Sequence, residues 1–158
     1  MVTNPIVRAL VIVLATAGGA GYAPVASGTV GSLVALPLVP WLARTRDQSW
    51  LLGLGIAVGI ALLAIWAAGR AELVFGGKDH SRIVIDEVAG MTTAALFVPA
   101  SWGAAVLVFV VFRILDVVKP FPAGLIDRKV HGGLGVVGDD LVAGAYAGIV
   151  TRLVLEVL

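Results

Sequence analysis

The stretch Trp50-Leu-Leu-Gly-Leu-Gly-Ile-Ala-Val-Gly-Ile-Ala-Leu-Leu-Ala-Ile-Trp-Ala-Ala-Gly69 has twenty residues and no charged side chain. An α-helix rises about 1.5 Å per residue, so a helix of this length spans the roughly 30 Å hydrocarbon core of a bilayer. Such a run is typical of a helix surrounded by lipid. The stretch therefore predicts a membrane-spanning helix, and the expected fold class follows from it.

The rest of the chain has the same apolar character. Of its 158 residues, 59% are hydrophobic and 13% are charged, and the mean hydropathy is +1.04. Soluble domains are about 25% charged, so this chain has too few polar residues to cover a surface in water. Breaker residues mark five more apolar segments, at Ile6–Ala20, Thr29–Leu42, Val88–Ala100, Trp102–Val118 and Leu141–Leu158.

These segments predict the architecture. We expect an all-α, multihelical integral membrane protein with about four to six apolar helices. The length of the chain indicates a single domain over residues 1–158. We leave open whether the protein forms a homo-oligomer.

Composition also excludes several kinds of protein. The net charge is +1 and no basic run occurs, so we expect no nucleic-acid partner. The chain has no cysteine, which excludes disulfides, thiolate nucleophiles and cysteine-bound metals. The first apolar segment has some features of a signal peptide. The apolar chain after it favours retention of this segment as a membrane helix.

The charged residues gather in two connections, Arg70–Ile85 and Lys119–Gly138, and at the adjoining helix ends. Two apolar segments separate the connections, so both lie on one side of the membrane if each segment crosses once. They hold most of the basic residues, whereas Arg44 and Arg46 lie on the opposite side. Because basic loops stay in the cytoplasm, we expect a multi-pass protein with its polar face toward the cytoplasm.

Two pairs of adjacent acidic residues stand directly before apolar segments: Asp86-Glu87 and Asp139-Asp140. Adjacent carboxylates repel each other, and a bound cation offsets that repulsion. Carboxylate oxygens suit a hard cation, so a chain without cysteine favours Mg²⁺ or Mn²⁺ over Zn²⁺. The alternatives are first-turn acids that complement a helix dipole, and a solvated helix cap.

Arg113, Asp116 and Lys119 are spaced three residues apart, which places them on one face of a helix. Ionisable residues beside a long apolar run are costly unless they are paired or functional. The residues therefore either close the helix end as an ion pair or contribute to a site.

Basic residues also precede a glycine-rich run in Asp127-Arg-Lys-Val-His-Gly-Gly-Leu-Gly135. Glycine lets backbone amides approach a phosphate closely, although such a run is most often a turn. The neighbouring cations favour an anionic ligand, and phosphate above others. A site of this kind at a lipid surface predicts a phospholipid head group as substrate.

In this order the motifs resemble those of the phosphatidylglycerophosphatase A family, over most of the chain. The resemblance rests on Ala26-Ser-Gly-Thr-Val-Gly-Ser32, Ile83-Val-Ile-Asp-Glu87 with Gly90, Phe112-Arg-Ile-Leu-Asp-Val-Val-Lys-Pro-Phe-Pro122, Asp127-Arg128 with His131-Gly-Gly-Leu-Gly135, and Asp139-Asp140 with Ala143-Gly144. It implies a multihelical enzyme of the bacterial inner membrane. It also implies hydrolysis of phosphatidylglycerophosphate to phosphatidylglycerol and inorganic phosphate, with Mg²⁺ required.

The residues and the resemblance together predict the roles of individual side chains. The expected metal ligands are Asp86, Glu87, Asp139, Asp140 and Asp116. The expected substrate-binding residues are Lys119, Arg128, Lys129, Arg113, His131, Gly132 and Gly133. The expected catalytic residues are Asp127, Asp79, Lys119 and Asp116, of which Asp127 or Asp79 orients the attacking water.

Two other functions compete with a phosphatase. Buried acidic and basic residues also line ion pathways in small membrane transporters, although here they gather at one membrane face. A related membrane phosphotransferase would use the same kind of site to move a phosphoalcohol. It would also need a nucleotide or acceptor site, and no motif of the sequence provides one.

Overall fold

The computed structural model describes residues 4–77 and 79–157. Within them the chain forms only helices, so the all-α prediction is confirmed for the described residues. In chain order these are α1 (Pro5–Ala15), η1 (Ala20–Tyr22), α2 (Ser27–Ala35), α3 (Leu38–Gln48), α4 (Trp50–Phe75), α5 (Ile85–Ala94), α6 (Trp102–Val118), α7 (Ala123–Lys129) and α8 (Gly133–Val157). Lys78, within the charged connection Arg70–Ile85, and Leu158, at the end of the last apolar segment, lie outside the described residues.

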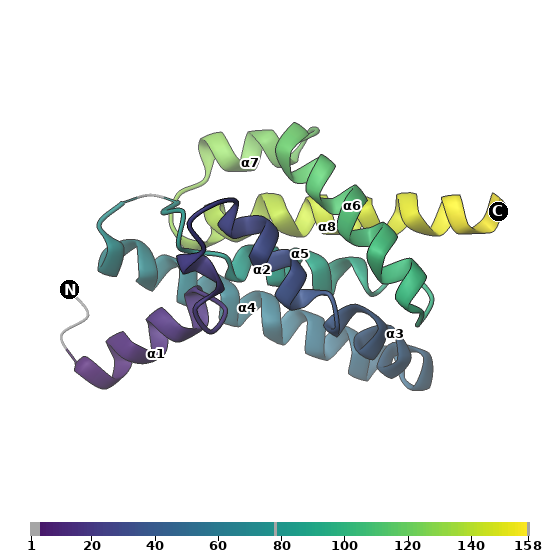
Figure 1. Cartoon of the computed structure of the whole chain (residues 1–158), viewed down its shortest axis with the longest axis horizontal. Coiled ribbons are helices and arrows are strands. Elements are labelled where there is room, and N and C mark those ends of the chain that lie inside the picture. Colours follow the sequence, from purple (N-terminus) through teal and green to yellow (C-terminus); the bar gives the residue numbers. More distant parts are fainter. Residues whose placement is uncertain (1–3, 78, 158) are drawn as a thin grey trace.

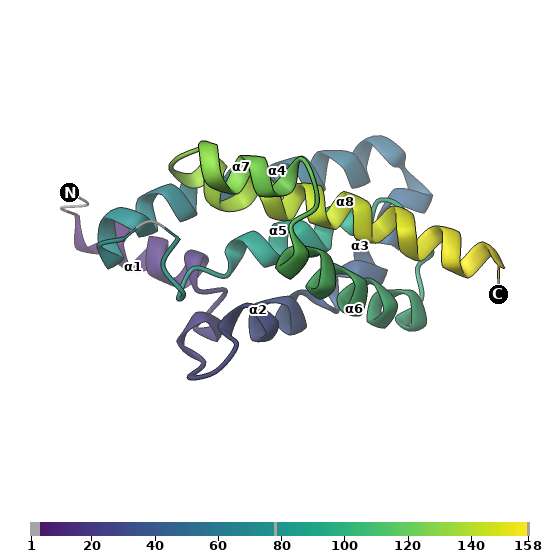
Figure 2. The same ribbon diagram turned by 90° about the horizontal axis from the view of Figure 1, so that it is seen from above.

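Helix α5 is the centre of the molecule. Figures 1 and 2 both show it enclosed by the long helices α4 and α8, with α2 and α6 on a further side. Two clusters of buried apolar side chains pack around it, one containing Met91 and Phe112 and the other containing Val11 and Ile85. Val88 packs against both clusters. A helix of ten residues is therefore held on most of its surface.

Two glycines allow α5 and α8 to pack closely. The backbone of Gly144 lies so near that of Gly90 that a β-carbon on Gly144 would collide with the Gly90 carbonyl oxygen. A β-carbon on Gly90 would in turn lie 2.5 Å from the ring of Phe112 and 2.8 Å from the carbonyl oxygen of Asp140. Small residues permit such approach of two helices. Gly144 therefore lets α5 and α8 pack closely.

The expected segment Thr29–Leu42 is divided into α2 and α3. Pro37 lies at the break and has no N–H to donate to the turn before it. The backbone instead makes two tighter hydrogen bonds, from Leu36 to Leu33 and from Val39 to Leu36. The expected segment Trp102–Val118 agrees with the bounds of α6, and α4 continues six residues past Gly69 to Phe75.

The second charged connection contains more helix than the sequence predicts. Helix α7 occupies its middle, and α8 begins at Gly133, inside the glycine-rich run. Gly133 is buried, and a β-carbon there would collide with the carbonyl oxygen of Ile65 in α4. This glycine therefore packs the start of α8 against α4.

By length and composition, two of the described helices could cross a membrane, α4 and α8. The sequence predicts about four to six apolar helices. In the structure α1 is apolar but has only 11 residues, α6 has 17, and α5 is enclosed by other helices. Of the apolar windows of these two helices, 28% is buried in α4 and 61% in α8, so the other described residues leave most of the apolar surface of α4 uncovered.

Candidate active site

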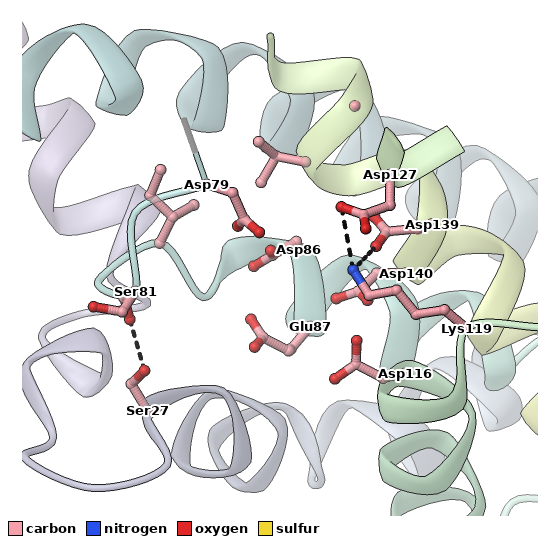
Figure 3. A pocket seen from close by; sticks show the side chains of 13 residues that line it. Ser27, Asp79, Ser81, Asp86, Glu87, Asp116, Lys119, Asp127, Asp139 and Asp140 are labelled. Carbon is pink, nitrogen blue, oxygen red and sulfur yellow. Dashed lines mark hydrogen bonds and ion pairs between the residues drawn. The ribbon is translucent and has the colours of Figure 1, made fainter. Parts of the chain in front are cut away.

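A cavity of about 290 Å³ opens where the ends of several helices meet. Figure 3 shows carboxylates entering it from the loop before α5, the start of α5, the end of α6, α7 and the second turn of α8. The acidic residues that line it are Asp79, Asp86, Glu87, Asp116, Asp127, Asp139 and Asp140. Among the described residues, one cation, Lys119, lines it with them. The cavity is therefore strongly acidic in the absence of a bound cation.

Three of these carboxylates converge closely enough to share one ion. One oxygen each of Asp86, Glu87 and Asp140 lies within 4.8 Å of the other two, and all three residues are buried. Asp86 Oδ1 and Glu87 Oε2 have no hydrogen-bond partner among the described residues. A buried carboxylate oxygen that receives no hydrogen bond destabilises the protein. Such oxygens are the ligands that a hard divalent cation prefers. The donor set fits Mg²⁺.

Burial changes the pKa of both carboxyl groups in the first turn of α5. Burial raises the pKa of Asp86 well above its ordinary value, and the charge of Glu87 raises it further. Burial also raises the pKa of Glu87. Both groups lie in the first turn of α5, close to Gly90, so the close packing of α5 on α8 brings them to Asp140.

Lys119 connects three helices at the cavity. It ends α6 in a left-handed conformation (φ 49°), immediately before Pro120. Its Nζ lies 2.7 Å from Asp139 Oδ2 and 3.3 Å from Asp127 Oδ1. Burial by itself would lower the pKa of Lys119, but its hydrogen bond to Asp139 and the charges of both carboxylates raise it above its ordinary value. The ammonium group is therefore charged throughout the neutral range.

Arg113 supports the acidic cluster from α6. Its Nη1 lies 2.8 Å from Asp116 Oδ2 and 3.8 Å from Glu87 Oε1. Arg113 is not among the residues that line the cavity, so it lies behind these two carboxylates. The arrangement fixes the side chain of Asp116 and partly offsets the charge of Glu87.

The start of α2 closes the cavity on another side. Gly28 lies directly against Glu87, and a β-carbon at this position would collide with Glu87 Oε1. Beside it, the Ser27 hydroxyl donates a 2.6 Å hydrogen bond to the carbonyl oxygen of Ser81, as Figure 3 shows. Only a residue without a side chain leaves Glu87 in its position here.

This acidic cavity is built from the motifs that carried the family resemblance. A family model described as phosphatidylglycerophosphatase A matches residues 13–155 of the chain. The chain belongs to the phosphatidylglycerophosphatase A family. It is therefore a phosphatase, and the cavity is its candidate active site.

Three curated relatives each match most of the chain. The phosphatidylglycerophosphatase A of Escherichia coli (strain K12) is 39% identical over 138 residues, which are 86% of this chain and 78% of the relative. That of Haemophilus influenzae (strain Rd) is 34% identical over 139 residues, or 87% and 83%. A Bacteroides thetaiotaomicron protein named "Putative phosphatidylinositol-3-phosphatase" is 33% identical over 147 residues, or 89% and 90%. No solved structure matches the chain.

The structure brings together every predicted metal ligand and catalytic residue at the cavity. Of the predicted substrate-binding residues, Lys119 lines it and Arg113 lies behind it. The others lie outside the lining: Arg128, Lys129, His131, Gly132 and Gly133. Arg128 and Lys129 are exposed at the end of α7, directly after Asp127.

The cavity also has members to which the sequence assigned no role. Ser27, Ser81, Ile83, Gly135 and Val136 line it. Ser27 belongs to the early family element, Ala26–Ser32, Ile83 to the element Ile83–Glu87, and Gly135 to the glycine-rich run. The family motifs therefore pointed to these three residues, but local sequence gave no physical reason to place α2 beside Glu87.

Proposed function

We propose that this family member hydrolyses the phosphomonoester of phosphatidylglycerophosphate, giving phosphatidylglycerol and inorganic phosphate, in a Mg²⁺-dependent reaction. The observation that carries the proposal is the convergence of Asp86, Glu87 and Asp140 within 4.8 Å, in a cavity that also holds Lys119. The names of two relatives support the substrate.

Asp86, Glu87 and Asp140 would hold the metal, with Asp139 and Asp116 as neighbouring carboxylates. When bound there, Mg²⁺ would supply Lewis-acid polarisation of the phosphoryl group and a lowered pKa for a water molecule. The ion would also compensate the oxygens of Asp86 and Glu87 that have no donor among the described residues.

The remaining roles fall to groups that line the cavity. Lys119 neutralises charge on the phosphomonoester, because its ammonium group faces the cavity and stays protonated. Asp127 or Asp79 accepts a hydrogen bond from the attacking water and takes up its proton. Asp127, at 3.3 Å from Lys119 Nζ, is held beside the incoming phosphate. Arg128 and Lys129 would meet the anionic head group outside the cavity.

The proposed setting is the bacterial inner membrane. We propose that α4 and α8 cross it, that shorter apolar helices complete a multi-pass domain, and that the cavity faces the cytoplasm. The lipid head group then reaches the cavity from the adjoining leaflet.

The competing functions receive less support. A transporter would place its ionisable groups along a path through the membrane, whereas the acidic residues named here share one cavity. Phosphotransfer would need an acceptor site beside that cavity. A third possibility is a different lipid phosphomonoester, since one relative bears a phosphoinositide name.

Phosphate release from the purified protein in detergent tests the proposal. The substrates are phosphatidylglycerophosphate and phosphatidylinositol 3-phosphate, each with Mg²⁺ or with EDTA. We expect release from phosphatidylglycerophosphate with Mg²⁺ alone. Faster release from the phosphoinositide would reassign the substrate, and release in EDTA would remove the metal from the proposal.

A matched pair of variants tests whether the activity depends on the carboxylate cluster. Asp140→Asn removes a charge from the cluster, whereas Asp47→Asn removes one from an exposed side chain that pairs with Arg46 and does not line the cavity. Loss of at least about 100-fold in turnover is expected for Asp140→Asn, with wild-type turnover for Asp47→Asn. Near-normal turnover of a folded Asp140→Asn protein would exclude the cluster as the metal site.

A further inference from the structure

A second, apolar groove lies next to the acidic cavity along α5. It has a volume of about 240 Å³ and is bounded by α1, by the turn after it, by α2 and α3, and by the first turns of α5. The residues that define its walls include Val13, Leu14, Val34, Ala35, Ile85 and Val88. All the described residues that line it are apolar or glycine, so neither a charged nor a polar side chain faces it.

The groove opens at the surface of the molecule. Its wall residues Val13 and Val34 are 56% and 51% exposed. Its apolar lining offers no side-chain hydrogen-bond partner, so the natural occupant is apolar. An extended peptide would bring backbone N–H and C=O groups that this lining cannot satisfy. A hydrocarbon chain has no such groups, and the chemistry of the groove therefore selects an acyl chain.

Two helices join the groove to the acidic cavity. In α5, Ile85 and Val88 line the groove, while Asp86 and Glu87 between them line the cavity. In α2, Gly28 touches Glu87, and Ala35 lines the groove seven residues later. Seven residues of helix rise about 10 Å, which is within the reach of one lipid molecule.

We infer that this groove binds an acyl chain of the lipid substrate while its phosphomonoester lies in the acidic cavity. The inference rests on the proposed function, because it takes a lipid phosphate as the substrate. Lipid tails are as apolar as the groove, so the gain is orientation of the head group and not hydrophobic transfer. The groove would thus favour phosphorylated lipids over water-soluble phosphomonoesters.

Photolabelling tests where the chain binds without requiring turnover. The probe is phosphatidylglycerophosphate with a diazirine in one acyl chain, added to the full-length protein in detergent with Mg²⁺. We expect labelled peptides from α1 and α2 that include Val13 and Val34. Excess unlabelled phosphatidylglycerophosphate should prevent this labelling, and phosphatidylcholine with the same chains should not. Labelling spread over the outer faces of α4 and α6, or insensitive to the substrate, would overturn the inference.

A pair of tryptophan variants gives a kinetic test. Val34→Trp fills the groove from its exposed wall, whereas Leu33→Trp places the same side chain at a neighbouring residue that is 50% exposed and does not line the groove. We expect Val34→Trp to lower kcat/KM for long-chain phosphatidylglycerophosphate about tenfold, equivalent to about 1.4 kcal/mol. Turnover of the deacylated head group, and both activities of Leu33→Trp, should stay within about twofold of wild type.

The outcomes separate the two proposals. If wild-type protein releases phosphate and Val34→Trp matches Leu33→Trp on the long-chain lipid, the groove inference fails and the phosphatase stands. If wild-type protein releases no phosphate from any substrate, the proposed function fails, and substrate-sensitive labelling still decides whether the groove binds a lipid chain.

Discussion

The Nζ atom of Lys119 lies 2.7 Å from Oδ2 of Asp139, which follows it by 20 residues. The same nitrogen lies 3.3 Å from Asp127 Oδ1. One cation at the end of α6 thus connects a carboxylate of α7 with a carboxylate of α8. Without it, two negative charges would face each other in a cavity that already holds five further acidic residues.

Lys119→Met should lower kcat/KM for phosphatidylglycerophosphate by about 100-fold or more, because one preorganised cation facing a phosphoryl group contributes on that scale. Lys119→Arg keeps the charge and should retain part of the activity. Phosphate release in detergent measures both. Arg152→Met, which breaks an exposed pair with Glu156, is the control and should behave as wild type. Equal activity of Lys119→Met and the control would contradict the assigned role.

The stability of the protein should depend on pH and Mg²⁺ together. Burial raises the pKa of Asp86 and Glu87, so the folded protein holds these protons more tightly than the unfolded chain. In EDTA, stability should therefore be greatest below the ordinary carboxyl pKa of about 4, and should fall as pH rises through the raised values. Mg²⁺ binds the ionised carboxylates, so its stabilising effect should grow over the same range.

Thermal unfolding in detergent from about pH 5 to about pH 8 checks this prediction. The difference in Tm between Mg²⁺ and EDTA should widen with pH. Asp86→Asn carries no titrating group at that position, so the difference in Tm between Mg²⁺ and EDTA should be smaller for this variant and should depend less on pH. A constant difference in the wild-type protein would show that these carboxyls do not control metal binding.

Gly28→Ala should reduce activity with little loss of fold. A methyl group at this position collides with Glu87 Oε1, so the side chain must leave its place in the acidic cluster. A displacement of about 1 Å from the productive geometry costs about 100-fold in rate. Gly55→Ala is the matched control, since a β-carbon there meets nothing within 4 Å. Steady-state phosphate release compares the two, and indistinguishable rates would remove Gly28 from the site.

Gly144→Ala should act on stability. The added methyl group collides with the backbone carbonyl of Gly90, which cannot move aside as a flexible side chain would. Forcing α5 and α8 apart should cost about 1–3 kcal/mol and lower the Tm in detergent. Gly55→Ala again serves as control and should leave the Tm unchanged or slightly higher, since alanine favours the helix. An unchanged Tm in Gly144→Ala would contradict the close packing of these helices.

Local patterns were sufficient where one segment decides its own structure. The uncharged run from Trp50 predicted α4, because a helix of that length satisfies its own backbone hydrogen bonds in any apolar surroundings. The limits of α6 followed from Trp102 and from the Pro120 that cannot continue a helix. Local patterns failed at Pro37, which divides one apolar segment into two helices, and at Gly133, where α8 begins earlier than its apolar run.

The sequence by itself determined which side chains are available for chemistry: paired carboxylates, a lysine after a helix, and no cysteine. Only the tertiary structure decided how they are combined. Asp86 meets Asp140 because Gly90 and Gly144 let two helices touch, and Glu87 meets α2 because Gly28 has no side chain. Those contacts join residues far apart along the chain, so their geometry depends on the packing of whole helices and is absent from any local pattern.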